Sequence, residues 1–215
     1  MQENNSSQEA FWERQEQIYK SSYITIGLMI VNVIIFVIST TVATYLYEKG
    51  AMITELVIRD GQYYRLFSAM FLHADTRHLL NNMLMLILAG AIVEYYTGHL
   101  FFIFLYIMSG LAGNMISMAY EIRNSLDWIS VGASGAIMGL VGFIAIWILI
   151  NRKNFVTNRN VIIRLGLLAL FVLQACFFQE GANTAAHLGG FLSGIVLGII
   201  NIVILRNNKK MEGLV

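Results

Sequence analysis

Hydrophobic residues along the chain fall into long runs that polar segments separate. The runs cover about 23–43, 78–97, 100–119, 133–150, 161–178 and 184–205. Each is close to the ~20 apolar residues that a helix needs to cross a membrane. The pattern predicts an all-α membrane protein, built as a bundle of six transmembrane helices within residues 23–205.

The polar segments are short, with one exception. The connection from Thr44 to Arg77 is the longest, and it mixes charged residues with aromatic and aliphatic ones. Such a mixture is typical of short amphipathic pieces that lie in the membrane interface. We therefore expect a long interfacial loop between the first two helices, flanked outside the bundle by short polar tails at 1–22 and 206–215.

The composition agrees with a membrane protein. Of the 215 residues, 57% are hydrophobic and only 13% are charged, whereas about a quarter of the residues in soluble domains are charged. The formal net charge is +1, and no basic patch with interleaved aromatic residues is present. We expect the lipid bilayer, and not a nucleic acid, to be the main partner.

The distribution of lysine and arginine predicts the orientation. If the N-terminus is cytoplasmic, nine basic residues lie in cytoplasmic segments and five lie outside. The nine are Arg14, Lys20, Arg152, Lys153, Arg159, Arg164, Arg206, Lys209 and Lys210, and the five are Lys49, Arg59, Arg65, Arg77 and Arg123. Because basic residues favour the cytoplasmic side, we expect both tails to be cytoplasmic in a multi-pass protein of the plasma membrane.

A serine among very small residues opens the fourth run, in Gly132-Ala133-Ser134-Gly135. Its backbone N–H would belong to the first turn of a helix, where amides lack intrahelical partners and the dipole is positive. Such a position can stabilise an oxyanion. A small-residue helix contact is the alternative interpretation of the same stretch.

Polar side chains at membrane depth are costly, so each needs an explanation. Ser134 precedes Arg152 by 18 residues, and His187 precedes Arg206 by 19. Both therefore lie ~27–28 Å from the cytoplasmic boundary, at ~1.5 Å per residue. In the second helix, by the same measure, Asn82 lies ~24 Å above that boundary, with His78 one turn higher.

Glycines predict that the fourth and sixth helices pack closely. Gly190 and Gly194 lie four residues apart in the sixth run, and Gly135 begins a glycine row in the fourth. Small residues at this spacing let helix backbones approach one another. This packing would bring the Ser134 hydroxyl within hydrogen-bond reach of the His187 ring.

A serine with a histidine base is the minimum for nucleophilic catalysis. No acid completes a triad, because Glu121, Asp127 and Glu180 are predicted to lie in loops. His78 and Asn82 can donate hydrogen bonds to an oxyanion, as the Ser134 amide can. We expect a Ser134–His187 dyad, and no metal or other cofactor.

Three motifs together resemble those of rhomboid intramembrane serine proteases in their minimal six-helix bacterial form. They are Gly132-Ala133-Ser134-Gly135 in the fourth run, Ala186-His187-Leu188-Gly189-Gly190 in the sixth, and His78-Leu79-Leu80-Asn81-Asn82 in the second. The resemblance implies that Ser134 is the nucleophile, that His187 is the base, and that His78 and Asn82 contribute to the oxyanion hole.

The resemblance also implies structural roles for Glu94 and His73, and it shows two departures. Where the family often has Trp-Arg in its first loop, this chain has Tyr64-Arg65, which keeps the bulk and the charge. The residue one turn after the nucleophile is often aromatic in the family, and here it is Met138. A thioether can still pack against an imidazole.

For function, the resemblance implies hydrolysis of peptide bonds in or near transmembrane segments of membrane proteins, at a site that opens to the extracytoplasmic side. Because a helix hides its backbone, substrates should be weakly helical near the cut. Two alternatives remain open: a catalytically inactive rhomboid-like protein that binds membrane clients, and a small membrane transporter. The substrate and the oligomeric state are not predicted.

Overall fold

The computed structural model describes residues 2–152 and 181–207, together with single positions at 163, 166, 169, 170, 172 and 174. At residues 2–8, 10 and 11 it describes the backbone alone. The predicted fifth transmembrane run, 161–178, lies almost wholly outside the described residues. The same holds for most of the polar tail at 206–215.

Helices dominate the described residues, and their order follows the hydrophobic runs. The elements are α1 (Gln2–Lys20), α2 (Tyr23–Thr41), α3 (Tyr45–Gly50), β1 (Met52–Ile53), α4 (Thr54–Arg59), α5 (Arg65–Ser68), the 3₁₀ turn η1 (Ala69–Phe71), α6 (Thr76–Met85), the π-helical turn η2 (Leu86–Gly90), α7 (Ala91–Thr97), α8 (His99–Asn124), β2 (Ile129–Ser130), α9 (Ser134–Ile150), α11 (Thr184–Ile199) and the π-helical turn η5 (Ile200–Ile204).

Four helical segments among the described residues are long and apolar enough to cross a membrane. They are Tyr23–Thr41, Thr76–Thr97, His99–Asn124 and Thr184–Ile204, and the apolar helix Ser134–Ile150 is slightly shorter. Five of the six predicted runs are therefore helices, which confirms an all-α membrane bundle. The polar N-terminal tail is also helical, as α1.

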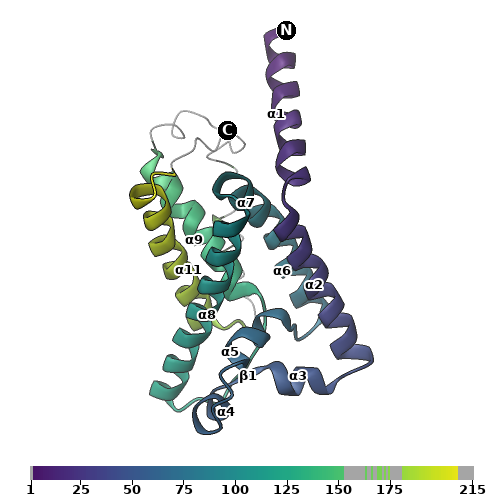
Figure 1. The fold of residues 1–215 in the computed structure, drawn as a ribbon, viewed down its shortest axis with the longest axis vertical. Helices are drawn as coiled ribbons and strands as arrows, with labels where there is room; N and C mark the ends of the chain where they lie inside the picture. Colours follow the sequence, from purple (N-terminus) through teal and green to yellow (C-terminus); the bar gives the residue numbers. More distant parts are fainter. Residues whose placement is uncertain are drawn as a thin grey trace.

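The bundle has two distinct ends (Figure 1). Helix α1 and the last turns of α11 lie at one end, and the short elements α3, β1, α4 and α5 of the long loop lie at the other. We refer to the second of these as the loop end. Helices α9 and α11 both begin toward the loop end, so their first turns lie at a similar level.

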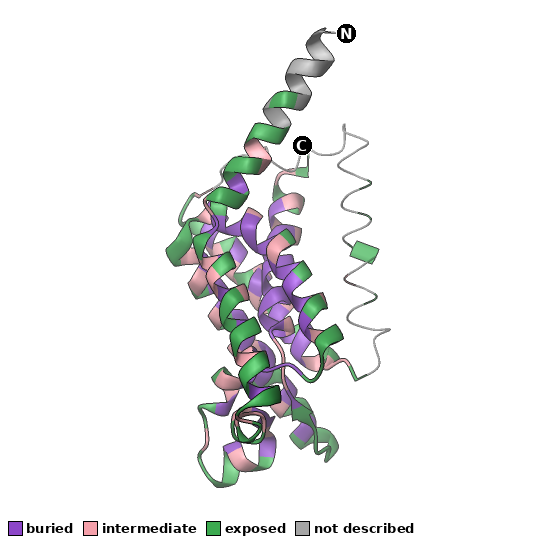
Figure 2. Ribbon diagram, turned by 90° about the vertical axis from the view of Figure 1, so that its right-hand side faces the viewer, coloured by how far each residue is buried: buried purple, intermediate pink, exposed green. Residues whose placement is uncertain are grey.

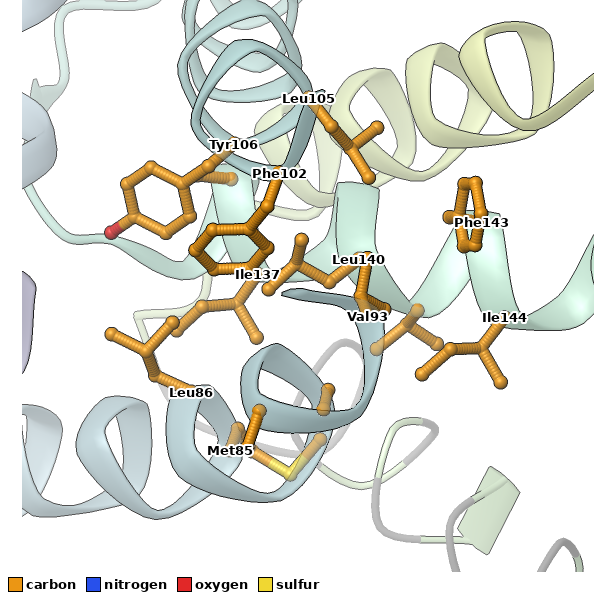
Figure 3. Close-up of a cluster of buried hydrophobic side chains, with 14 of the residues drawn as sticks. Met85, Leu86, Val93, Phe102, Leu105, Tyr106, Ile137, Leu140, Phe143 and Ile144 are labelled. Carbon is orange, nitrogen blue, oxygen red and sulfur yellow. The ribbon is translucent and has the colours of Figure 1, made fainter. Parts of the chain in front are cut away.

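Apolar side chains fill the interior of the bundle. Buried positions line the inner helix faces, while the outer faces remain exposed for lipid (Figure 2). One cluster joins α6, η2, α7, α8 and α9, with Phe102, Leu140 and Phe143 among its fully buried members (Figure 3). This core holds α9, and therefore Ser134 at its start, against α8.

Helices α9 and α11 meet through their backbones. A methyl group added at Gly190 would overlap the Gly135 carbonyl oxygen, and one added at Gly194 would overlap that of Gly139. Glycine is therefore required at both positions for this close approach. The contact agrees with the small-residue packing predicted for the fourth and sixth runs.

The long loop is anchored by buried polar groups. The Arg65 side chain is almost fully buried, and it donates to the backbone oxygens of Glu48 (2.9 Å) and Ala51 (2.7 Å) and to the Gln62 side chain (2.7 Å). Strand β1 pairs antiparallel with β2, which was not predicted from the sequence. This ribbon connects the loop to the segment that precedes Ser134.

At the opposite end, Glu94 of α7 binds the start of α2. Its fully buried carboxylate accepts hydrogen bonds from the backbone amides of Ile24 (2.8 Å) and Thr25 (2.7 Å) and from the Thr25 hydroxyl (2.7 Å). The His99 ring nitrogen lies 2.6 Å from the same group. A carboxylate at a helix N-terminus satisfies unpaired amides and interacts favourably with the dipole.

Candidate active site

Ser134 is the first residue of α9, and the turn before it depends on glycine. Gly132 has φ +128°, a backbone conformation that other residues rarely adopt. Its amide donates to the Ala69 carbonyl oxygen (2.9 Å), which fixes the turn against η1. The Ser134 amide belongs to the first helical turn and therefore has no intrahelical acceptor.

His187 lies in the first turn of α11, and its ring faces Ser134. Its Nε2 atom is 2.9 Å from the Ser134 Oγ atom. A neutral imidazole can accept the serine proton at this distance. The Nδ1 atom of His187 is buried and has no hydrogen-bond partner among the described residues. The arrangement is a serine–histidine pair without a carboxylate partner in the described part of the chain.

His78 and Asn82 lie one turn apart on α6. The helix is capped by Asp75, whose Oδ1 atom accepts from the His78 amide (2.8 Å). The His78 ring and the Ser134 hydroxyl lie on either side of Gly132. The position that a Gly132 Cβ would occupy is 2.8 Å from His78 Nε2 and 3.6 Å from Ser134 Oγ, so the ring lies close to the serine. The Asn82 Nδ2 atom is buried without a partner among the described residues, and it is free to donate.

One cavity connects these groups. It has a volume of about 670 Å³, and its lining includes Ser134, His187, His78, Asn82 and Met138. The structure therefore brings the four predicted polar residues to one site, with the Met138 side chain in its wall. Among the described residues, no three His, Cys, Asp or Glu side chains form a group that could hold a metal ion.

His73 lies behind His78, in the loop before α6. Its ring is fully buried, and the two ring centroids are 5.2 Å apart in an edge-to-face arrangement. Burial lowers the pKa of His73 to about 3, and the neighbouring His78 contributes to this lowering. His73 is therefore neutral in the folded protein at ordinary pH.

This burial makes stability depend on pH. Below about pH 6.5 the unfolded chain protonates His73, but the folded protein does not until about pH 3. The free energy of unfolding therefore falls by ~1.4 kcal/mol per pH unit as the pH falls through this window. Between pH 7 and pH 5, the free energy of unfolding of the parent should fall by ~2 kcal/mol more than that of His73→Asn. Unfolding in detergent at the two pH values measures this difference. Equal losses in the two proteins would contradict a neutral, buried His73.

Two polar residues near the site were not identified from the sequence. Glu121 was predicted to lie in a loop, but it lies in α8, because this helix continues to Asn124 before Ser125 ends it in a left-handed conformation. Its side chain is fully buried. Asn183 caps α11, and its side chain accepts from the Ala186 amide. An asparagine just before an apolar run is a recognisable helix start, so the sequence did hold a signal for Asn183.

The comparisons with known proteins agree on one family. A family model described as a Rhomboid domain matches residues 60–203. RHOMBOID-like protein 2 of Arabidopsis thaliana is 36% identical over 158 residues, which are 74% of this chain and 48% of that protein. Rhomboid protease AarA of Providencia stuartii is 30% identical over 206 residues, covering 84% of this chain and 73% of the relative.

The plant relatives are longer than this chain. The match spans 48% of RHOMBOID-like protein 2 and 39% of RHOMBOID-like protein 1, which is 32% identical over 158 residues. The matched region of this chain includes α6, α9 and α11, which carry Ser134, His187, His78 and Asn82 of the cavity.

Proposed function

The chain belongs to the rhomboid family, and we propose that it is a serine endopeptidase that hydrolyses peptide bonds in or near transmembrane segments of membrane proteins. The observation that carries the proposal is the 2.9 Å contact between Ser134 Oγ and His187 Nε2 on the wall of a cavity. Membership of a family that includes a protein named as a rhomboid protease supports it.

In the first half of the reaction, the Ser134 oxygen attacks the substrate carbonyl carbon while His187 Nε2 takes the serine proton. A tetrahedral intermediate with a negatively charged oxygen forms. The C–N bond then breaks, His187 gives its proton to the leaving amine, and an ester remains on Ser134. In the second half, His187 removes a proton from water, whose oxygen attacks the ester carbon. The C–O bond to Ser134 then breaks, His187 returns the proton to the Ser134 oxygen, and the acid product leaves.

The negatively charged oxygen needs hydrogen-bond donors fixed in advance. The Ser134 amide, in the first turn of α9, is one donor. The Asn82 Nδ2 atom, which has no partner in the described part of the chain, is a second. The His78 ring, which lies against Gly132, is a third. Supporting this assignment, all three residues line the same cavity.

Asn82→Ala should therefore lower kcat by about 10²-fold with little change in KM, because the oxyanion forms only in the transition state. Asn32→Ala is the matched control, since Asn32 is also a buried amide but does not line the cavity. We expect it to leave kcat within about threefold of the parent. If Asn82→Ala behaves like the control, Asn82 does not belong to the oxyanion hole.

Substrates should present a weakly helical transmembrane segment, since a regular helix keeps its peptide bonds hidden. A small side chain at the cut would fit beside Ser134. We also propose that the protein lies in the plasma membrane with both tails cytoplasmic. The cavity is then on the extracytoplasmic side, because the first turns of α9 and α11 lie toward the loop end.

The test is cleavage of a single-span membrane substrate by the purified chain in proteoliposomes, with product masses that locate the cut. We expect a cut near the outer end of the substrate's transmembrane segment, and none with Ser134→Ala. A client-binding protein would instead co-purify with the substrate and leave it intact. A transporter would leave the substrate uncut and move a solute, and either result would overturn the proposal.

A further inference from the structure

A chain of hydrogen bonds runs from Glu121 of α8, in the interior, to Asn183 in the wall of the cavity. The Oε1 atom of Glu121 accepts from the Ser117 hydroxyl (3.0 Å), and its Oε2 atom accepts from the Thr54 hydroxyl (2.6 Å). All three residues are buried, and Glu121 and Ser117 are fully so. No step of the proposed reaction uses them.

The chain continues to Asn183, which connects three elements. Its Nδ2 atom donates to Ser117 of α8 (2.6 Å) and to Ser130 of β2 (2.8 Å). Its Oδ1 atom accepts from the Ala186 amide (3.0 Å), and its backbone oxygen accepts from the His187 amide (3.0 Å). Asn183 therefore holds the helix that carries His187 to the strand that leads into Ser134.

The Ala186 amide determines the direction of the bonds that the Asn183 side chain makes. A backbone amide can only donate, so Asn183 must turn Oδ1 toward Ala186 and Nδ2 toward the two serines. Ser117 then accepts from Asn183 and donates its own proton to Glu121. Glu121 accepts from both Ser117 and Thr54, so it is the acceptor at the inner end of the chain.

We propose that Glu121 and Asn183 are positioning residues that hold His187 against Ser134 through Ser117. This inference rests on the proposed function. A small error in the placement of a catalytic base costs much of the rate. Because Thr54 also binds Glu121, the long loop stabilises the same arrangement from the other side.

The polarity of the chain allows a test by inversion. Asn183→Asp keeps the cap on Ala186 but removes both donors, so Ser117 cannot satisfy two carboxylates with one proton. We expect kcat to fall by about 30-fold, with KM little changed. Glu121→Gln alone should lower kcat by only about threefold, because one amide group still reaches Ser117 and Thr54.

Combining the two substitutions reverses both bonds of Ser117, while the Ala186 amide still donates to residue 183. The side-chain amide introduced by Glu121→Gln donates to Ser117, and Ser117 donates to the carboxylate introduced by Asn183→Asp. We expect Glu121→Gln to raise the kcat of Asn183→Asp by about tenfold. A residue that only supports the fold would give additive losses instead.

The measurement is kcat and KM for the four proteins, with enzyme concentration taken from complete labelling by a fluorophosphonate probe, so that misfolded protein is not counted. Asn124→Asp is the matched control: it adds the same charge three residues from Glu121, at an exposed amide bound to the Tyr120 carbonyl. It should leave kcat within about twofold of the parent, and Glu121→Gln should not improve it.

A parent that cuts, with no recovery in the double variant, overturns this inference and leaves the proposed function standing. A parent that neither cuts nor reacts with the probe overturns both. If Asn183→Asp does not fold, Ser117→Ala decides, because it breaks the chain at its centre. A kcat about tenfold lower with KM unchanged supports the inference, and an unchanged kcat overturns it.

Discussion

Gly194→Ala is expected to destabilise the protein by at least ~3 kcal/mol, because the added methyl group overlaps the backbone of a neighbouring helix. The overlapping atoms are the carbonyl group and Cα of Gly139 on α9. A backbone carbonyl has no alternative rotamer, so α9 and α11 must move apart. Thermal unfolding in detergent should show a Tm well below that of the parent.

Gly27→Ala is the matched control for this prediction. Gly27 also lies within an apolar helix, but nothing lies within 4 Å of the position that its Cβ would occupy. Alanine favours helix over glycine by up to ~1 kcal/mol, so this variant should be as stable as the parent or slightly more so. If Gly194→Ala and Gly27→Ala unfold at the same temperature, the close contact of α9 with α11 is wrong.

His187→Ala and Ser134→Ala should each lower kcat by about 10⁴-fold, because the two side chains act as one unit. Without His187, Ser134 loses the hydrogen-bond partner that takes its proton. Without Ser134, no oxygen can form the ester. The double variant should be no slower than either single one, since removing either group already stops the covalent route.

His99→Ala is the control for loss of a histidine. His99 is exposed at the end of the bundle opposite the cavity, where its ring binds Glu94. We expect its kcat to stay within about threefold of the parent, even though its stability falls. A similar loss of rate in His99→Ala and His187→Ala would mean that His187 acts through the fold and not as the base.

Much of the architecture could be predicted because it is recorded locally in the sequence. Long apolar runs without charge leave few alternatives to membrane helices, and the bounds of α2 and α9 agree with the predicted runs within about two residues. Glycines spaced four apart predicted the packing of α9 on α11. That packing, with residue depth, was enough to place Ser134 near His187.

Other features depend on contacts between distant residues. Glu121 looked like a loop residue because a carboxylate rarely lies buried in a membrane helix. It is accommodated by hydroxyls from Ser117 and from Thr54, which lies 67 residues away in the sequence. The pairing of β1 with β2 likewise joins two-residue strands, too short to leave a periodic pattern. Only the assembled fold reveals these contacts.

The most direct test of the account is to find which residue reacts with a fluorophosphonate probe. The purified chain would be labelled in lipid, digested, and analysed by mass spectrometry. The account predicts one modified residue, Ser134, with labelling lost in Ser134→Ala and strongly slowed in His187→Ala. Labelling that persists in Ser134→Ala, or a parent that stays unlabelled in several lipid mixtures, would contradict a serine nucleophile at this site.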